Sequence, residues 1–324
     1  MKRRTFLLAG LGLTLSSSAA LWLSDKKNPA LQSFSAADII FGTTVSIQVL
    51  HHDAHGAAQA LQAAMNALHN IDSLMSLYRP DSQLSQLNQH GKLVDPHPEL
   101  LHVLQIAQNL SLQTDGAFDV TVQPLWLAAN QRQSIQSAKK HVNWKNLSIS
   151  KDQVRFARDG MSITLNGIAQ GYGVDRALEV LKHHGIEHAL LDTGEFGSLG
   201  RRDDGNPWTL AIQNPREANQ YVQLLALDGR SMATSGDYAA RFTDNYQQHH
   251  IFDPHTGKSP TELACVTVLA PSGLLADGLS TACMVLGAKK SLALISQMEN
   301  VDILCIDKLG HQSRSAGFPL HAAG

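Results

Sequence analysis

The chain has 324 residues, of which 43% are hydrophobic and 17% are charged. Its 26 Lys and Arg against 28 Asp and Glu give a formal net charge of −2, without a block of like charges. A protein that binds nucleic acid normally carries a basic excess, and a disordered chain is poorer in apolar residues, so we expect a folded protein with no nucleic-acid partner.

The N-terminus has the pattern of an export signal. Basic residues at positions 2–4 precede an uncharged run over residues 6–23, which is typical of a targeting segment. The adjacent Arg3 and Arg4 are similar to a twin-arginine signal, the address of proteins that are exported folded. We therefore assign residues 1–30 to a signal and expect a periplasmic protein. An uncleaved membrane anchor is the alternative, because the run is nearly long enough to span a bilayer.

The next stretch predicts a strand and two amphipathic helices. Apolar side chains alternate with polar ones over residues 45–49, as in a half-buried strand. Apolar residues then recur every three or four positions over residues 61–75, which predicts a helix, and a second helix begins after Pro98. The Gln- and Ser-rich segment 130–146 predicts a loop.

The second half predicts strands and helices that follow one another without a linker or repeat. A strand over residues 162–165 leads into a glycine-bearing turn and a helix around residues 174–181. Helices are also expected at 276–286 and 289–298, and strands at 188–191, 208–213, 221–227, 264–269 and 301–306. The pattern favours a single α+β domain over residues 34–324.

The cysteines indicate neither a disulfide framework nor a metal cluster. Cys265, Cys283 and Cys305 are odd in number, widely spaced and embedded in apolar runs, so we expect them in the core. Beyond the N-terminus no uninterrupted run of 18 or more apolar residues occurs, so no further membrane span is expected.

The segment 274–282 carries the strongest local signal for chemistry. Asp277 and Thr281 are four residues apart, so a helix places a carboxylate and a hydroxyl on one face. Hard oxygen ligands of this kind suit Mg²⁺, which completes its shell with water and phosphate. An Asp near a helix start can equally be a cap, and the spacing leaves both interpretations open.

Other segments concentrate glycine, hydroxyl, carboxylate and imidazole groups. In segment 165–173 a strand runs into a glycine-bearing turn that opens a helix, which suits either an anion at the helix N-terminus or tight packing. Segment 116–121 places Phe118 beside Asp119. Segment 233–257 gathers polar groups in predicted loops, where chemistry usually lies.

Taken together, these segments resemble the ApbE family of FAD:protein FMN transferases, over residues 41–287. The motifs follow the family order and are Phe41-Gly42-Thr43-Thr44, the segments 75–82 and 84–88, and the segments 116–121, 165–173, 233–257 and 274–282. The resemblance implies one α+β domain of the ApbE type, which is T-fold-like, with mixed or antiparallel sheets and packed helices. It also implies a Mg²⁺-dependent enzyme that splits FAD, attaches FMN through a phosphoester to a Thr of an acceptor protein and releases AMP.

The family motifs also imply roles for individual residues. The Gly167 carbonyl would hold Mg²⁺ together with Asp277 and Thr281. His250 and Asp253 would lie at the pyrophosphate, with His250 as the general base for the acceptor hydroxyl.

The remaining motif positions would bind the FAD substrate. Tyr78 would line the flavin site. The adenine or flavin end would be held by Ala117, Phe118 and Asp119, and the other expected FAD contacts are Phe41, Thr164, Gln170 and Ile251.

Several positions depart from the family pattern. The family often has Met at Phe41, Asp at Thr164 and Lys or Glu at Gln170, and a double Gly before Glu where this chain has segment 192–195. Thr164 lacks the carboxylate but keeps a hydroxyl that can hydrogen-bond FAD. With the twin-arginine signal, these departures resemble the exported NosX-like branch, which flavinylates a membrane-bound electron carrier of nitrous oxide respiration. An FAD pyrophosphatase and a non-catalytic flavin-binding accessory protein are the alternatives.

Overall fold

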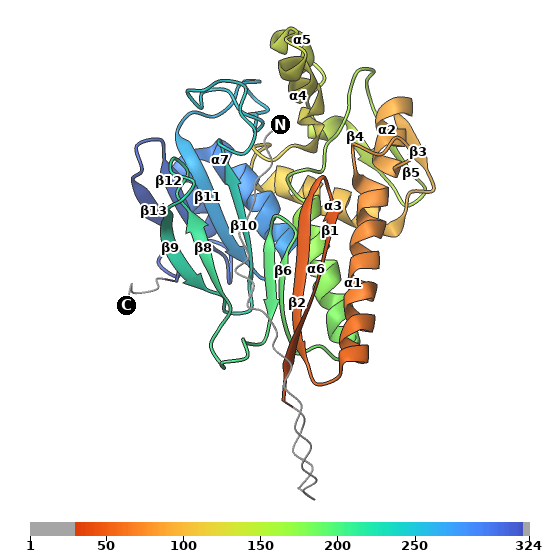
Figure 1. Cartoon of the computed structure of the whole chain (residues 1–324). Coiled ribbons are helices and arrows are strands. Elements are labelled where there is room, and N and C mark those ends of the chain that lie inside the picture. The colour runs from red at the N-terminus through yellow and green to blue at the C-terminus, as the bar shows by residue number, and fades with distance from the viewer. Residues whose placement is uncertain (1–29, 320–324) are drawn as a thin grey trace, which may run out of the picture. The chain divides into compact units, whose positions relative to one another are not determined.

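A computed structural model of the chain describes residues 30–319 (Figure 1). The expected export signal, residues 1–30, lies outside the described residues except for its last position. From Leu31 onward the chain forms one unit. Its helices are α1 (Ala54–Met75), α2 (Gln83–His90), α3 (Pro98–Gln113), α4 (Gln123–Asn130), α5 (Ile135–Lys139), α6 (Ala169–His183) and α7 (Gly273–Ile295), with short 3₁₀ turns η1 (Val120–Val122) and η2 (Trp144–Asn146).

The strands form one large antiparallel sheet and two small ones. They are β1 (Gln32–Ile40), β2 (Thr43–His51), β3 (Lys92–Val94), β4 (Leu147–Ile149), β5 (Gln153–Phe156), β6 (His188–Asp192), β7 (Phe196–Leu199), β8 (Thr209–Gln213), β9 (Tyr221–Ala226), β10 (Ser231–Gly236), β11 (Leu263–Ala270), β12 (Asp302–Asp307) and β13 (Gln312–Arg314). The eight-stranded sheet has the order β1-β2-β6-β7-β10-β11-β12-β13, and β3-β5-β4 and β8-β9 form the small sheets. The α+β architecture is the one that the sequence predicts.

The large sheet separates two apolar layers. On one face α1 and α6 pack over β2 and β6, and α7 packs over β10 and β11 (Figure 1). On the other face the β8-β9 hairpin packs against the sheet around the buried Trp208 and Leu225. Alternation in β2 sends Val45, Ile47 and Val49 to the helical face, where each is fully buried. The predicted strand and its core face are therefore confirmed.

Local signals place the predicted helices. Asp53 caps α1 by accepting a hydrogen bond from the Gly56 N–H at 2.7 Å, and Leu61, Leu68 and Ile71 face the core at the predicted spacing. Pro98 starts α3, in the first turn, where its missing N–H removes no helical hydrogen bond.

Two predicted elements differ from the structure. Residues 161–165 are extended but belong to no strand, because the side-chain amide of Asn88 pairs with the backbone of Ile163 in place of a neighbouring strand, at 2.7 and 2.8 Å. The predicted loop 130–146 contains α5 and η2, since Ser134 and Asn143 cap these short turns with their side chains.

The long C-terminal helix agrees with the prediction of two helical segments. Gly287 has φ 76° and ψ 168° inside α7, so the helix is broken between the two predicted halves. Among the described residues, α7 is the one helix long and apolar enough to cross a membrane. Asp277 interrupts the apolar run of this helix, and much of the helix is buried in the core with Cys283. All three cysteines are buried and free, as expected.

The N-terminal ends of α6 and α7 are joined by reciprocal capping. Asp175 of α6 accepts hydrogen bonds from the Gly273 and Leu274 N–H groups at the start of α7, at 2.6 and 2.9 Å. In return, Asp277 of α7 accepts one from the Gly171 N–H at the start of α6, at 3.0 Å. Each carboxylate thus satisfies free N–H groups, and lies at the positive dipole end, of the other helix.

The same contact requires glycine on both helices. A Cβ added to Gly171 would lie 2.1 Å from the Gly273 carbonyl oxygen, and one added to Gly273 would lie 2.4 Å from that of Gly171. Both glycines have ordinary helical φ, so the requirement is close approach of backbones and not unusual backbone geometry.

We expect Gly171→Ala to lower the free energy of unfolding by roughly 3 kcal/mol or more, because the backbone of α7 must move away. Gly56→Ala, in the first turn of α1, is the matched control, since the atoms nearest its added Cβ belong to the side chains of His51 and Asp53, at 3.0 and 3.1 Å, and side chains can shift where a backbone cannot. Urea unfolding of both variants measures the difference. Equal stability of the Gly171 and Gly56 variants would contradict the close contact.

Candidate functional site

The three predicted metal-binding groups meet where α6 and α7 begin. A Cβ built on Gly167, which precedes α6, would lie 2.8 Å from the Thr281 hydroxyl oxygen, so the Gly167 backbone touches this side chain. Asp277 stands one turn before Thr281 on α7 and reaches Gly171 near the start of α6. The structure therefore places a carboxylate and a hydroxyl on one helix face, as the spacing predicts, and the backbone of the Gly167 turn beside the hydroxyl.

Asp277 is a buried carboxylate without a cationic side chain beside it. Its exposed fraction is 3%, and it forms no ion pair within residues 30–319. Burial raises the pKa of the Asp277 carboxyl to about 7, the hydrogen bond from Gly171 opposes this rise, and the charge of Asp175 adds to it. A buried carboxylate in this condition fits a bound cation, which would compensate its charge.

Asp277 acts as a helix cap, but for α6 and not for its own helix. Ser272 is the N-cap of α7, and its hydroxyl accepts a hydrogen bond from the Leu275 N–H at 3.2 Å, so Asp277 does not cap its own helix. It caps α6 instead, through one carboxylate oxygen. The other oxygen of Asp277 accepts no hydrogen bond from the described residues, which leaves it for a ligand.

The donor set suits a hard cation. Within the described part of the chain, no three His, Cys, Asp or Glu side chains gather as a metal cluster. A single carboxylate with hydroxyl and carbonyl oxygens is instead the kind of set from which Mg²⁺ takes one or two ligands, with water and phosphate for the rest. The residues present therefore fit Mg²⁺ better than a metal that prefers nitrogen or sulfur ligands.

The sequence did not predict the contact of the Thr281 hydroxyl with a serine hydroxyl of β10. Ser235 of β10 lies with its Oγ 2.8 Å from Ser280 Oγ and 3.2 Å from Thr281 Oγ1. Ser235 belongs to segment 233–257, which was recognised as rich in functional groups, but nothing in the sequence distinguishes it from its neighbour Thr234. The pairing of β10 with α7 makes the distinction.

Thr164 and Gln170 lie on either side of the Gly167 turn. The Thr164 N–H donates to the Val120 carbonyl at 2.8 Å, and its hydroxyl accepts from the Asn166 N–H at 3.2 Å. The Gln170 side-chain amide donates to the Thr193 carbonyl at 2.7 Å, so it braces α6 against the β6-β7 turn. Both side chains are half-buried.

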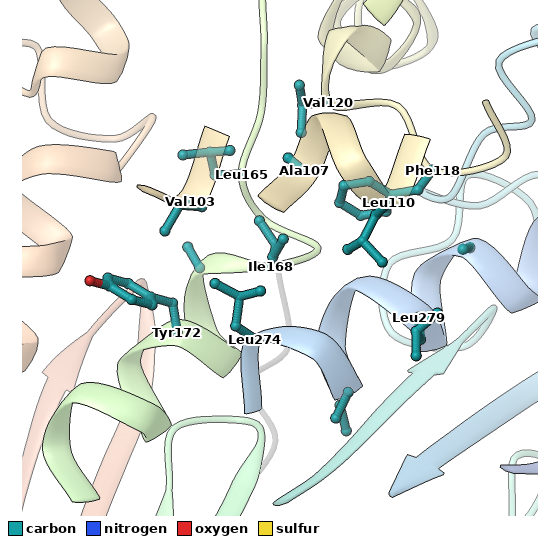
Figure 2. Packing of buried hydrophobic residues seen from close by; sticks show 14 of the residues in the cluster. Val103, Ala107, Leu110, Phe118, Val120, Leu165, Ile168, Tyr172, Leu274 and Leu279 are labelled. Carbon is teal, nitrogen blue, oxygen red and sulfur yellow. The ribbon is translucent and has the colours of Figure 1, made fainter. Parts of the chain in front are cut away.

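Ala117, Phe118 and Asp119 follow α3 in the chain, and their side chains are buried. Figure 2 shows the Phe118 ring beside Leu110 of α3 in the core. The Asp119 carboxylate accepts hydrogen bonds from the Thr121 N–H and hydroxyl and from the Trp144 N–H, at 2.7, 2.6 and 3.0 Å. Burial raises the pKa of Asp119, and these hydrogen bonds oppose the rise. Asp119 therefore organises the local backbone before it meets any ligand.

Phe41 and Tyr78 lie at the turn between β1 and β2. Phe41 has φ 55°, in the left-handed region, and its ring packs 3.1 Å from the position of a Cβ on Gly173 of α6. The Tyr78 ring lies 3.9 Å from the position of a Cβ on Gly42. Tyr78 is 70% exposed, so its ring is available for stacking with a planar ligand.

His250, Ile251 and Asp253 lie on the loop after β10. His250 Nδ1 is 3.1 Å from the Ala240 carbonyl, and a carbonyl can only accept, so Nδ1 carries the proton and Nε2 is the basic nitrogen of the neutral ring. Ile251 is buried. Asp253 Oδ1 accepts from the His255 N–H at 2.8 Å, so it holds its own turn.

This loop reaches the segment around residue 116. The His255 ring lies 3.6 Å from the position of a Cβ on Gly116, so the loop and the Ala117–Asp119 motif are in contact. A cleft of about 840 Å³ includes in its wall Leu77, which precedes Tyr78 in the chain, and Ser162. Its basic side chains, Lys92, Arg155 and Arg158, form no ion pair within the described residues.

The comparison with protein families and sequences identifies close relatives. The ApbE family model matches residues 41–305. The chain is 31% identical to the FAD:protein FMN transferase of Vibrio cholerae over 309 residues, which cover 90% of this chain and 92% of that protein. It is 30% identical to the protein of the same name from Salmonella typhimurium, over 85% of each chain.

Solved structures agree with the sequence comparison. The flavin transferase ApbE from Vibrio cholerae superposes with a TM-score of 0.79 at 27% identity, over 89% of this chain and 98% of that one. The apo form of the Pseudomonas stutzeri flavinyl transferase ApbE gives a TM-score of 0.78 at 30% identity, over 93% and 100%. These likenesses extend over almost the whole described unit.

The raised pKa of Asp277 predicts a pH-dependent effect of neutralising it. The native state holds this proton more tightly than the unfolded chain, so its contribution to stability falls as pH rises from about 4 to about 7. The Asp277→Asn side chain can still accept a hydrogen bond from Gly171. In EDTA at pH 8, we expect the free energy of unfolding of this variant to be roughly 1–3 kcal/mol higher than that of wild type. At pH 4 the two should be nearly equal.

Chemical unfolding at both pH values checks this expectation. Asp81→Asn is the control, because the Asp81 side chain is 77% exposed and should show no such pH dependence. A variant at Asp277 that is no more stable than wild type at pH 8 would show that burial does not penalise this charge.

Proposed function

Because the chain belongs to the ApbE family, we propose that it is a Mg²⁺-dependent FAD:protein FMN transferase. In the proposed reaction, the hydroxyl oxygen of an acceptor Thr forms a bond to the phosphorus of the FMN half of FAD. The bond from that phosphorus to the bridging pyrophosphate oxygen breaks, and AMP leaves with this oxygen. The hydroxyl proton passes to a base.

The observation that carries the proposal is the uncompensated Asp277 carboxylate, buried beside Thr281 and the Gly167 backbone. We propose that these residues hold Mg²⁺ through a carboxylate, a hydroxyl and a carbonyl oxygen. When bound, Mg²⁺ supplies neutralisation of the charge that develops on the pyrophosphate. The chain itself provides positioning, because α7, which carries Asp277 and Thr281, and α6, which Gly167 precedes, are fixed to each other by their mutual caps.

We propose His250 as the general base because it occupies the family-like motif at residues 249–257, where the hydrogen bond between its Nδ1 and the Ala240 carbonyl fixes the ring. Imidazole titrates near neutral pH and can take the proton of a hydroxyl group as it attacks. Asp253 has an indirect role: it accepts a hydrogen bond from the His255 N–H and so fixes the turn that follows His250.

The FAD contacts are proposed at positions on the two sides of this centre. Tyr78 offers an exposed ring for the isoalloxazine, and Phe41 lies beside Gly173 of α6. On the other side, Ala117, Phe118, Asp119 and Ile251 shape the wall, and Thr164 and Gln170 border the turn that presents Gly167.

The acceptor is proposed to be another protein of the same compartment. We infer a membrane-associated electron-transfer protein with a target Thr, as in the NosX-like branch that serves nitrous oxide respiration. The support is the twin-arginine pattern at Arg3 and Arg4, together with the departures at Phe41, Thr164 and Gln170. Periplasmic location is proposed on the same N-terminal pattern.

Incubation with FAD, Mg²⁺ and a candidate acceptor domain tests the activity. We expect covalent flavin on the acceptor and release of AMP, detected by in-gel fluorescence and chromatography. Asp277→Ala should slow transfer roughly 100-fold or more, because it leaves phosphate charge uncompensated. Thr281→Val should have a smaller effect, since water can replace one neutral ligand.

Each other outcome of the assay contradicts the proposed transfer. Free FMN with AMP, without covalent flavin, identifies an FAD pyrophosphatase, and unchanged FAD identifies a binding protein. An Asp277→Ala protein with wild-type rate and wild-type Mg²⁺ dependence shows that the metal lies elsewhere.

Export is tested separately. We expect residues 1–35, fused to a reporter protein, to deliver it to the periplasm only in cells with an intact twin-arginine pathway. Changing Arg3 and Arg4 to Lys keeps the charge but should abolish export. Unimpaired export of that fusion would exclude the twin-arginine assignment.

A further inference from the structure

The hydroxyl groups of Ser235, Ser280 and Thr281 form a connected group between β10 and α7. Ser235 Oγ lies between the other two, 2.8 Å from Ser280 Oγ and 3.2 Å from Thr281 Oγ1. Ser280 Oγ in turn donates to the Asp277 carbonyl oxygen at 2.9 Å. Ser280 is fully buried, so its hydrogen bonds are made within the protein.

The number of hydroxyl protons determines which group donates in each of these hydrogen bonds. Each hydroxyl has one proton to donate. Ser280 uses its proton on the Asp277 carbonyl, so in the contact with Ser235 it can only accept. Ser235 therefore donates to Ser280, and in its contact with Thr281 it must accept. The Thr281 proton is thus directed toward Ser235.

This direction determines what Thr281 presents to the site. With its proton on Ser235, Thr281 Oγ1 keeps its lone pairs for a ligand on the side of Gly167. A hydroxyl that binds a cation must turn its lone pairs, and not its proton, toward the metal. Partners that orient a metal ligand in this way influence metal affinity without touching the metal.

We propose that Ser235 is a positioning residue for the metal site: it takes the Thr281 proton, so that the Thr281 oxygen is always presented as a cation ligand. The inference rests on the proposed Mg²⁺ site and adds to it the residue that fixes the orientation of one ligand. Without Ser235, the Thr281 hydroxyl can rotate, and some of its orientations point the proton at the cation.

The neighbouring residue provides a matched control. Thr234 precedes Ser235 on β10, so its side chain points to the opposite face of the sheet. There its hydroxyl pairs with that of Thr267 on β11, at 2.9 Å and directly across the strands. Thr234→Val therefore removes a strand hydroxyl of the same kind without touching Thr281.

The test measures metal binding directly. We propose titrating the protein with Mn²⁺, a paramagnetic substitute for Mg²⁺, and following free Mn²⁺ by electron paramagnetic resonance, with melting temperature recorded in EDTA. Ser235→Ala should bind Mn²⁺ roughly 10-fold more weakly than wild type, as for other partners that orient a ligand. Thr234→Val should stay within about twofold of wild type.

A second variant separates orientation from folding. Ser280→Ala places a stronger helix former inside α7, so we expect the melting temperature to be unchanged or higher. It also removes the acceptor of the Ser235 proton, which can then turn toward Thr281 and reverse that hydrogen bond. Metal affinity should therefore fall while stability does not, a combination that a purely structural role cannot produce.

The outcomes distinguish this inference from the proposed function. Wild-type affinity in Ser235→Ala, or an equal loss in Ser235→Ala and Thr234→Val, overturns the positioning role while the metal site stands. Wild-type affinity in Ser280→Ala overturns the proton order. Absence of Mn²⁺ binding by wild type overturns the metal site and the inference together. Mn²⁺ binding with the predicted pattern but no flavin transfer leaves the inference standing and contradicts only the proposed activity.

Discussion

The reciprocal capping of α6 and α7 is the interaction on which the rest of the site depends. Asp175 and Asp277 each bind the N-terminal N–H groups of the other's helix, while Gly171 and Gly273 allow the two backbones to touch. Neither helix can shift along the other without breaking charge-assisted hydrogen bonds at both ends of the contact. The Gly167 turn, which leads into α6, is thereby held against α7.

The same carboxylate thus serves the fold and the proposed chemistry. Asp277 uses one oxygen to cap α6 and leaves the other without a partner among the described residues, at a position where burial raises its pKa. Burying a charge in this way costs stability, and a protein recovers that cost when a cation binds. The arrangement therefore links metal binding to the stability of the helix pair.

The apolar core beneath the helix ends explains why the surrounding segments are so closely placed. Phe118, Leu165 and Ile168 enter one cluster with residues of α3, α6 and α7 (Figure 2), so the motifs that flank the site are anchored by burial on its inner side. Asn88 completes this support by pairing with the backbone of Ile163 in place of a strand. Rigid support of this kind lets loops carry binding groups with little loss of precision.

Periodicity in the sequence was enough to predict the α+β class, the β2 strand and the core faces of α1 and α6, because Val45, Leu68 and Leu181 belong to apolar faces that the local pattern reveals, and all three are buried. The four-residue spacing of Asp277 and Thr281 likewise predicted a shared helix face, and the motifs predicted the family. The sequence could not show that Asp277 caps a helix about a hundred residues away, that residues 161–165 lack a strand partner, or that Ser235 and not Thr234 faces Thr281. These features depend on which elements pack together, and contacts between distant segments are decided by the tertiary structure, where burial and hydrogen bonding act on the whole chain at once.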